Sequence, residues 1–192
     1  MFSLQICQSL DHLNKSWTEL ALLCLGTPTH HPERVKTFCF AREALRLALC
    51  ELNLKPEISD LVLSGYHSLP TFPEITLSLT HSKNVGVALV GHKENYQSLG
   101  VDVEYSDRVV KDEIIQKVAH PQDAGLRNIE IWVLKEAAFK CLMNSGRFSS
   151  PVHLTDIEVS AQIWRHSPSG ITGACEIRQE QNLILGLAFL KS

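Results

Sequence analysis

Two carboxylates stand two residues apart in the segment QSLGVDVEY, at positions 97–105. Successive side chains of a β-strand alternate between its two faces, so Asp102 and Glu104 share one face with Gly100. The opposite face is apolar and carries Leu99, Val101 and Val103. Neighbouring carboxylates repel each other and are costly to desolvate without a compensating cation or hydrogen-bond donor. The pattern therefore predicts either a solvated face or a face that holds something positive.

A second charged group lies on the helical segment IWVLKEAAFKCLM, which is apolar around most of its circumference. Its charged residues are Lys135, Glu136 and Lys140, and the last two share a face because they are one helical turn apart. Taken alone, this spacing is typical of an exposed ion pair that contributes about 0.3 kcal/mol. On a helix that is largely buried, however, surplus charge requires a partner.

Further polar candidates come from the first half of the chain. The segment SLTHS contains Thr80 and His81, and by itself it is typical of a hydrogen-bonded hairpin tip. Arg34 precedes a predicted helix and Arg42 lies within it, and such residues usually form a solvated face. Each of these signals is weak alone.

Together the charged groups indicate one kind of chemistry. Asp102, Glu104 and Glu136 would supply three hard oxygen ligands, which suit Mg²⁺. Lys140, His81 and the arginines would supply positive charge for phosphate groups. A site of this composition fits phosphoryl-type transfer, in which catalysis comes mostly from positioning and charge neutralisation.

Three segments in this order resemble the motifs of the 4′-phosphopantetheinyl transferases. GVDVE at 100–104 and WVLKEAAFK at 132–140 are similar to the two signature motifs of that family, and SLTHS at 78–82 is similar to its third short motif. The likeness is to the larger single-chain surfactin- and enterobactin-type enzymes and covers about residues 33–158. It implies two similar α+β lobes related by a pseudo-two-fold axis, with coenzyme A in the cleft between them. It also implies Mg²⁺-dependent transfer of the phosphopantetheine arm to a serine of an acyl or peptidyl carrier protein.

The resemblance assigns the metal and the catalytic step to three acids and a lysine. Asp102, Glu104 and Glu136 match the metal-binding acids, and the expected catalytic residues are Glu136, Lys140 and Asp102. Glu136 is the favoured base for the carrier serine, directly or through a water, and Lys140 is the competing candidate. Both lie on the same helix face, so the sequence does not separate them.

The resemblance also implies a set of residues that bind coenzyme A, namely Arg34, Arg42, Thr80, His81 and Lys140. Thr80 and His81 match the pair near the 3′-phosphate, and Lys140 matches the lysine beside the coenzyme's other phosphates. The sequence departs from the family pattern at Val133, where relatives have a small polar residue. It departs again at Leu69, which precedes Pro70 where surfactin-type relatives have a lysine.

Two other classes of function use the same residues. A non-catalytic module that binds a carrier protein or a nucleotide would keep the fold without turnover, although acids at all three metal positions count against it. A Mg²⁺-dependent phosphodiesterase would use the same carboxylates to direct water at a phosphate ester.

The elements that must position these residues indicate the α+β class. Helical spacing predicts helices over residues 40–54 and 128–143, and strict alternation predicts a hairpin of ITLSLTHS and VGVALVG that turns around residues 82–84. A strand over QSLGVDVE, a short helix ending before Pro121 and further short strands follow. We expect two lobes, residues 1–98 for coenzyme A and residues 99–192 for the metal and catalytic motifs.

Composition and charge exclude several alternatives. The 192 residues are 44% hydrophobic and 20% charged, as in globular proteins, and the net charge of -3 favours neither nucleic acid nor an anionic membrane as a partner. The six cysteines form no C-x-x-C pair and are interpreted as reduced, buried thiols. The first residues lack a basic stretch and a long apolar run, so we expect a cytoplasmic protein, and a monomer.

A carrier protein would dock on a local surface, because the chain as a whole is negative. The stretch from Arg108 to Arg127 follows the acidic strand and precedes the charged helix. It offers an apolar stripe at helical spacing, formed by Val110, Ile114, Ile115 and Val118, with Lys111 and Lys117 among the basic residues around it. The alternative is that the whole stripe packs inward.

Overall fold

The computed structural model describes residues 1–9, 15–25, 32–65, 67–123, 125–148 and 151–192. The protein is a mixed α+β structure with two antiparallel sheets, which confirms the expected class. Its contacts divide it into unit 1, Met1–His92, and unit 2, Lys93–Ser192. The division falls shortly before the expected boundary at 98/99, because β4 already begins at Tyr96 and pairs with β8 of unit 2.

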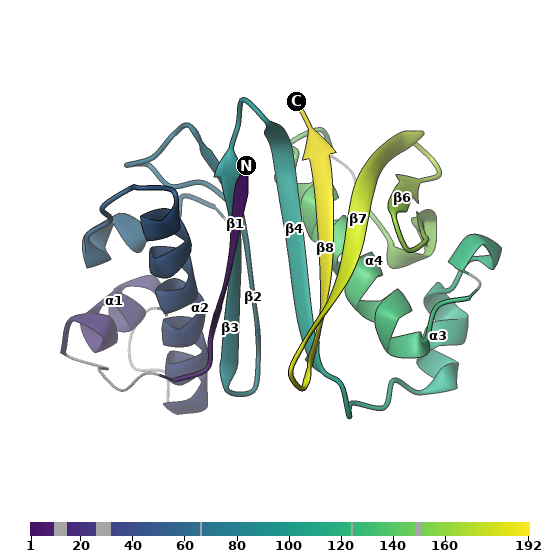
Figure 1. Ribbon diagram of the computed structural model, residues 1–192, viewed down its shortest axis with the longest axis horizontal. Helices are drawn as coiled ribbons and strands as arrows, with labels where there is room; N and C mark the ends of the chain where they lie inside the picture. The colour runs from purple at the N-terminus through teal and green to yellow at the C-terminus, as the bar shows by residue number, and fades with distance from the viewer. Residues whose placement is uncertain (10–14, 26–31, 66, 124, 149–150) are drawn as a thin grey trace. The chain divides into compact units, whose positions relative to one another are not determined.

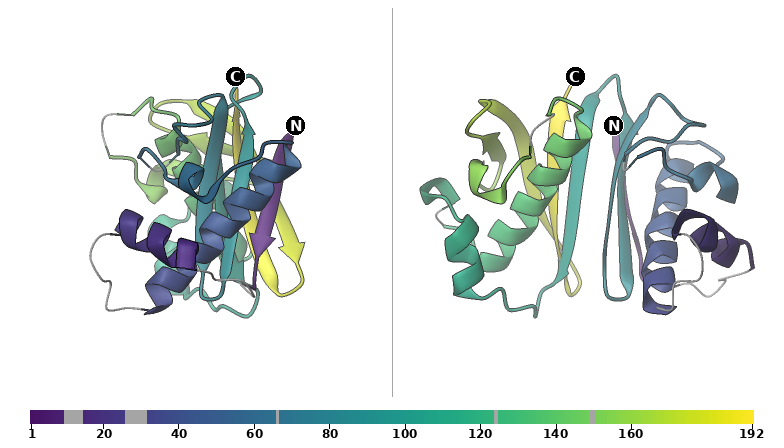
Figure 2. Two further views of the ribbon diagram at one scale, coloured as in Figure 1. Left: turned by 90° about the vertical axis from the view of Figure 1, so that its left-hand side faces the viewer. Right: turned by 180° about the vertical axis from the view of Figure 1, so that it is seen from behind.

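Unit 1 is a helix-covered three-stranded sheet. Its described elements are β1 (Phe2–Cys7), α1 (Lys15–Leu25), α2 (Pro32–Glu51), the 3-10 helix η1 (Ile58–Leu61), β2 (Ile75–Ser82) and β3 (Val85–His92). The strand order is β1-β3-β2, with both pairings antiparallel. α2 lies along one face of this sheet and α1 packs on α2, as Figure 1 and the turned view in Figure 2 show.

The core of unit 1 forms where α2 meets the sheet. Apolar residues recur on α2 at helical spacing, and those buried against the strands and α1 include Cys39, Ala44, Leu45, Ala48 and Leu49. α2 approaches β3 so closely at Gly86 that a Cβ there would lie 2.2 Å from the carbonyl carbon of Phe40. Gly86 is therefore needed for the helix to lie against the strand.

Unit 2 is built around a five-stranded sheet. Its elements are β4 (Tyr96–Tyr105), α3 (Asp112–Val118), η2 (Pro121–Asp123), α4 (Asn128–Asn144), η3 (Leu154–Asp156), β5 (Ile157–Val159), β6 (Ile163–His166), β7 (Ile171–Glu180) and β8 (Leu183–Lys191). The strand order is β4-β8-β7-β6-β5, with every pairing antiparallel. α4 crosses one face of the sheet over β4 and β8, as the view from behind in Figure 2 shows.

The predicted alternation of β4 is confirmed. Gly100 lies on the side that faces α4, because a Cβ on it would meet the carbonyl oxygen of Ala137 at 1.9 Å. Asp102 and Glu104 share that side, and the three apolar residues of the strand lie on the other. Gly100 therefore leaves room for the backbone of α4.

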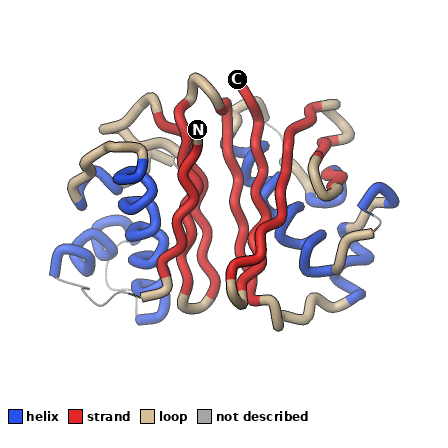
Figure 3. Tube along the Cα trace, in the orientation of Figure 1, coloured by secondary structure: helices blue, strands red, loops and turns tan. Residues whose placement is uncertain are grey.

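Most expected elements are present, with two differences. The helix predicted over 40–54 begins earlier, at Pro32, and ends at Glu51. The strand β1 was not predicted, since it is short, carries the polar residues Ser3 and Gln5, and pairs with the distant β3. The predicted β2–β3 hairpin and the helix over 128–143 are confirmed. Figure 3 shows that each sheet has helices on one face.

The cysteines were expected to be reduced, buried thiols, and four of the six are buried. All six cysteines are free thiols, and four are buried while Cys24 is half-buried and Cys50 is exposed. Burial raises the pKa of Cys141 and of Cys175 to about 12, so these two thiols are not nucleophiles at neutral pH. Among the described helices, none combines the length and the apolar character needed to cross a bilayer.

Candidate functional site in unit 2

Asp102 and Lys140 form an ion pair that joins β4 to α4. The Lys140 Nζ lies 2.7 Å from the Asp102 Oδ1 and also donates to the carbonyl oxygen of Val101 at 3.1 Å. The pair is mostly shielded from solvent, with the Lys140 side chain 27% exposed and the Asp102 side chain 10% exposed. The positive partner that the sequence pattern required is therefore, at least in part, a lysine of the same chain.

Glu136 is the third carboxylate of the group, and α4 carries it one turn before Lys140. It is half-buried, and this burial raises its pKa, as does the negative charge of Asp102. The positive charges of Lys140 and Arg108 oppose that shift. These interactions place Glu136 within electrostatic reach of Asp102, so the fold brings together carboxylates from two separate motifs.

Glu104 is buried and pairs with Arg108, which follows the end of β4. The Arg108 guanidinium also lies 5.8 Å from the centre of the Trp132 ring on α4, a cation–π distance. The sequence assigned Arg108 only to the basic surroundings of a docking surface. Its role as the partner of Glu104 was missed, although a cation four residues after the acid was a visible signal.

Lys135 has a different environment from the other charges of α4. Its side chain is fully buried, and its Nζ lies 2.9 Å from the Oδ2 of Asp123 in η2, whose side chain is 2% exposed. Burial lowers the pKa of Lys135, and the hydrogen bond and charge of Asp123 oppose that shift. Asp123 was not singled out in the sequence, because nothing local distinguishes it from other loop aspartates.

The predicted metal ligands can be compared with this geometry. Among the described residues, no group of three or more His, Cys, Asp and Glu side chains is gathered closely enough to hold a metal ion. The donor atoms are nevertheless of the type that Mg²⁺ takes. Burial, and then the charge of Asp102, raise the pKa of Glu136, and a cation beside the two carboxylates would oppose both effects. Asp102, Glu104 and Glu136 therefore fit a divalent cation in chemistry, and their joint ligation stays a prediction.

The coenzyme residues predicted in unit 1 do not all face the same way. His81 pairs with Gly86, so its side chain lies on the α2 side of the sheet near the hairpin tip, and it is exposed. Thr80 is its neighbour on the strand, lies on the opposite face and is buried. A ligand that contacts both side chains must therefore reach around the end of β2.

α2 carries the two predicted arginines. Arg34 is exposed in the first part of the helix, and nearby Lys36 donates to the Asn84 side chain at 2.9 Å, which ties this part of α2 to the β2–β3 turn. Arg42 is half-buried, with its guanidinium 4.8 Å from the Phe38 ring centre. Its buried Nε has no hydrogen-bond partner among the described residues, and burial lowers its pKa.

A phosphate could meet this Nε only if the side chains that cover it moved aside. No match to this chain was found among protein-family models or among curated proteins.

Proposed function

We propose that this chain is a 4′-phosphopantetheinyl transferase, which moves the phosphopantetheine arm of coenzyme A to a serine of an acyl or peptidyl carrier protein. In this proposal the two units are the two lobes of that fold, unit 1 chiefly for the coenzyme and unit 2 for the metal and the reaction. The observation that carries it is the meeting of the GVDVE and WVLKEAAFK segments, in which Asp102 pairs with Lys140 at 2.7 Å and Glu136 lies beside both.

Asp102, Glu104 and Glu136 would hold Mg²⁺, whose charge would offset the charge that develops on the pyrophosphate during transfer. Lys140 and Arg108 already compensate two of these acids. When the metal and coenzyme A are bound, the Lys140 and Arg108 side chains would also contact phosphate oxygens, because they lie beside the acids that hold the metal. The site would thus act mainly by positioning and by neutralising charge.

The carrier serine would attack the β-phosphorus of coenzyme A. The new bond joins the serine oxygen to that phosphorus, the bond from the phosphorus to the bridging oxygen breaks, and 3′,5′-ADP leaves with that oxygen. The serine proton passes to Glu136, directly or through a water. A raised pKa suits a carboxylate for this role, whereas the Lys140 Nζ is engaged by the Asp102 carboxylate and the Val101 carbonyl oxygen.

In unit 1, Arg42 supports the binding of a phosphorylated coenzyme. Its buried Nε lacks a partner in the described part of the chain, and its guanidinium is fixed against Phe38. Arg34, Thr80 and His81 are the other proposed contacts, with His81 at the 3′-phosphate. A phosphate with several oxygens could accept from more than one of these side chains.

The test is a mass measurement. The purified protein is incubated with Mg²⁺, coenzyme A and apo forms of acyl and peptidyl carrier proteins, and each carrier is then weighed. We expect one carrier to gain the mass of a phosphopantetheine arm. The gain should disappear in EDTA and in Asp102→Asn.

Other outcomes would support the other classes. Loss of an existing arm from a holo carrier would indicate a phosphodiesterase. Binding of coenzyme A or carrier with no mass change in any carrier would indicate a non-catalytic module, and either result would overturn the proposal.

A further inference from the structure

The buried ion pair between Lys135 and Asp123 joins three elements of unit 2. Lys135 comes from the middle of α4, and its Nζ lies 2.9 Å from the Asp123 Oδ2 and also donates to the carbonyl oxygen of Ile157 in β5. The Asp123 carboxylate accepts from the backbone N–H of Val159 at 2.8 Å and from that of His120 at 2.7 Å. One carboxylate thus connects η2 and β5 to α4.

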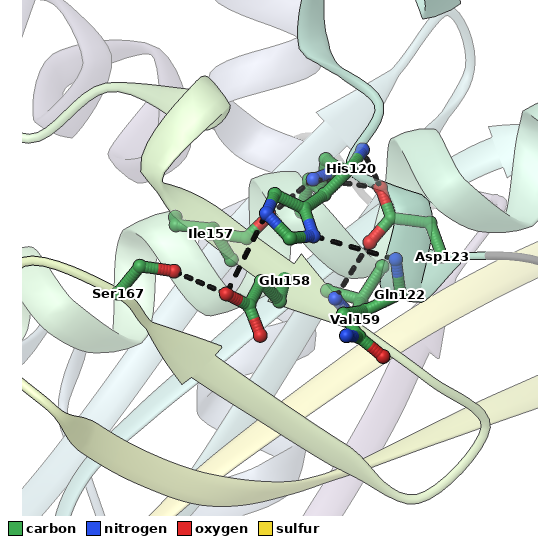
Figure 4. A network of polar contacts seen from close by, with 8 residues as sticks. His120, Gln122, Asp123, Ile157, Glu158, Val159 and Ser167 are labelled. Atoms are coloured by element: carbon green, nitrogen blue, oxygen red, sulfur yellow. Dashed lines mark hydrogen bonds and ion pairs between the residues drawn. The ribbon is translucent and has the colours of Figure 1, made fainter.

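Further polar contacts lie beside this carboxylate, as Figure 4 shows. The His120 Nε2 lies 3.7 Å from the Glu158 Oε1, and Ser167 donates to the same Glu158 carboxylate. The Nδ1 of His120 accepts from the backbone N–H of Gln122 at 3.3 Å. These contacts tie the residue before η2 to β5, and β5 to the residue after β6, so the segment that carries Asp123 is itself held in place.

Stability alone does not explain a pair as deeply buried as this. The side chains of Lys135 and Asp123 are 0% and 2% exposed, and removing two charges from water costs several kcal/mol for each ion. Well-packed apolar side chains of the same volume are often as stabilising or more so. An ion pair differs from an apolar contact in being directional, because the ammonium must meet the carboxylate and the Ile157 carbonyl at defined points.

This directional contact lies directly beside the proposed site. Lys135 is the residue before Glu136 on α4, and Lys140 lies one helical turn after Glu136. Lys135 is tied to η2 and β5, while Lys140 is tied to Asp102 on β4. A helix held at both points cannot rotate or slide, and rotation would move the Glu136 carboxylate relative to Asp102.

We propose that Lys135 and Asp123 are positioning residues for the transfer reaction, which set the placement of α4 so that Glu136 and Lys140 meet the acids of β4. The inference rests on the proposed function for its kinetic consequence but not for its structural one. Neither residue touches the substrate. Their loss should therefore lower kcat more than it raises the KM for coenzyme A, which the proposed Lys140 contact also affects.

The main test replaces the ion pair with an apolar pair in the variant Lys135→Met/Asp123→Leu. We expect a folded protein with a lower Tm, because the backbone N–H groups of Val159 and His120 lose their acceptor. We also expect a kcat lower by about 10- to 100-fold when measured well below that Tm, since small misplacements of reacting groups cost this much. The ¹⁵N signal of the Lys140 ammonium should also shift, because its contact with Asp102 changes. The matched control is Glu130→Gln, which removes the charge of the Arg127–Glu130 pair at the start of the same helix, where the Glu130 side chain is 17% exposed, and should leave kcat unchanged.

The outcomes separate this inference from the proposed function. A double variant with wild-type kcat and an unshifted Lys140 signal would overturn the inference. If the wild type transfers nothing, the proposed function fails, and the Lys140 signal still decides whether the pair positions α4. Should the double variant not fold, Asp123→Asn measured well below its Tm takes its place. It keeps an acceptor for one backbone N–H, and wild-type kcat in this variant would equally overturn the inference.

Discussion

The charge of Asp102 is balanced by Lys140, a residue 38 positions further along the chain. This pairing changes the interpretation of the two charges on α4. Glu136 and Lys140 are not simply an exposed pair one turn apart, since Lys140 reaches across to β4 and Glu136 is half-buried with a raised pKa. At the scale of single residues, the site is a set of carboxylates whose excess negative charge is only partly compensated.

Replacing Asp102 with Asn tests the metal site directly. We expect kcat to fall by about 100-fold or more, in the range seen when one preorganised electrostatic group is removed. The fold should persist, because Asn keeps the shape of the side chain and Lys140 keeps its bond to the Val101 carbonyl. Asp107→Asn, at an exposed acid after the same strand, is the control. Full activity of Asp102→Asn at saturating Mg²⁺ would contradict the metal site.

Glu136→Gln tests the excess charge through the dependence of Tm on pH. Burial and the charge of Asp102 raise the folded-state pKa of Glu136 above its unfolded value. The stability that Glu136 contributes is therefore present below the unfolded pKa and is lost as the pH rises through the folded pKa. In EDTA, the variant should exceed the wild type in Tm above that folded pKa and lose this advantage at lower pH.

Mg²⁺ provides the second half of that measurement. If Glu136 helps to hold the ion, adding Mg²⁺ should raise the Tm of the wild type more than that of Glu136→Gln. Equal increases in the two proteins would remove Glu136 from the predicted ligand set.

Among the elements, α4 depends on a glycine of β4 for its position. A Cβ at Gly100 would lie 1.9 Å from the Ala137 carbonyl oxygen and 2.7 Å from the Cys141 nitrogen, both backbone atoms. We expect Gly100→Ala to destabilise the protein by about 1–3 kcal/mol and to lower kcat as α4 moves away from β4. Denaturant unfolding measures the first effect. Wild-type stability with weakened Mg²⁺ binding would instead indicate that Gly100 leaves room for the metal.

The predicted docking stripe at α3 is buried in one part and exposed in another. Val110 and Ile115 are buried in the core between α3 and α4, and Val118 packs against it, so this part of the stripe is structural. Ile114 is 42% exposed, and Lys111 and Lys117 are exposed beside it. The alternative that the whole stripe packs inward is therefore wrong for Ile114, and a smaller docking surface of Lys111, Ile114 and Lys117 remains a prediction.

Reversing the two charges of this surface should affect the carrier alone. In Lys111→Glu/Lys117→Glu we expect a higher KM for the carrier protein, an unchanged KM for coenzyme A and a weaker response of carrier binding to salt. Lys55→Glu/Lys191→Glu reverses two exposed lysines elsewhere and controls for net charge. Unaltered carrier kinetics in the α3 variant would move the docking surface to unit 1.

At the scale of the whole molecule, each unit has its own hydrophobic core. In unit 1 the core gathers α1, α2 and the three strands, and in unit 2 it gathers α4 and the strands beneath it. The proposed roles are divided in the same way, with coenzyme recognition assigned to unit 1 and the metal and base to unit 2. Changes in the two units should then affect different kinetic constants.

His81→Ala tests this division. Wild type should prefer coenzyme A to 3′-dephospho-coenzyme A, and the variant should lose much of that preference through KM, with kcat changed little. Exposure of His81 at the hairpin tip makes a loss of stability small. An unchanged preference ratio would move the 3′-phosphate contact to Arg34 and Arg42.

The sequence by itself determined the features that depend on backbone periodicity. Alternation along β4 placed Asp102 and Glu104 on one face, and helical spacing placed Glu136 beside Lys140, because both patterns follow from local geometry. The same periodicity predicted most of α2, all but one residue of α4 and the β2–β3 hairpin.

Only the tertiary structure decided which charges meet. Lys140 could have paired with Glu136, but the packing of α4 on β4 brings it to Asp102. Lys135 pairs with Asp123 of the separate element η2, and Gly100 is required by the backbone of α4. The physical reason is that the partner of a charge depends on which elements lie against each other. That arrangement is set by the burial of apolar faces over the whole unit, and no short segment of sequence contains it.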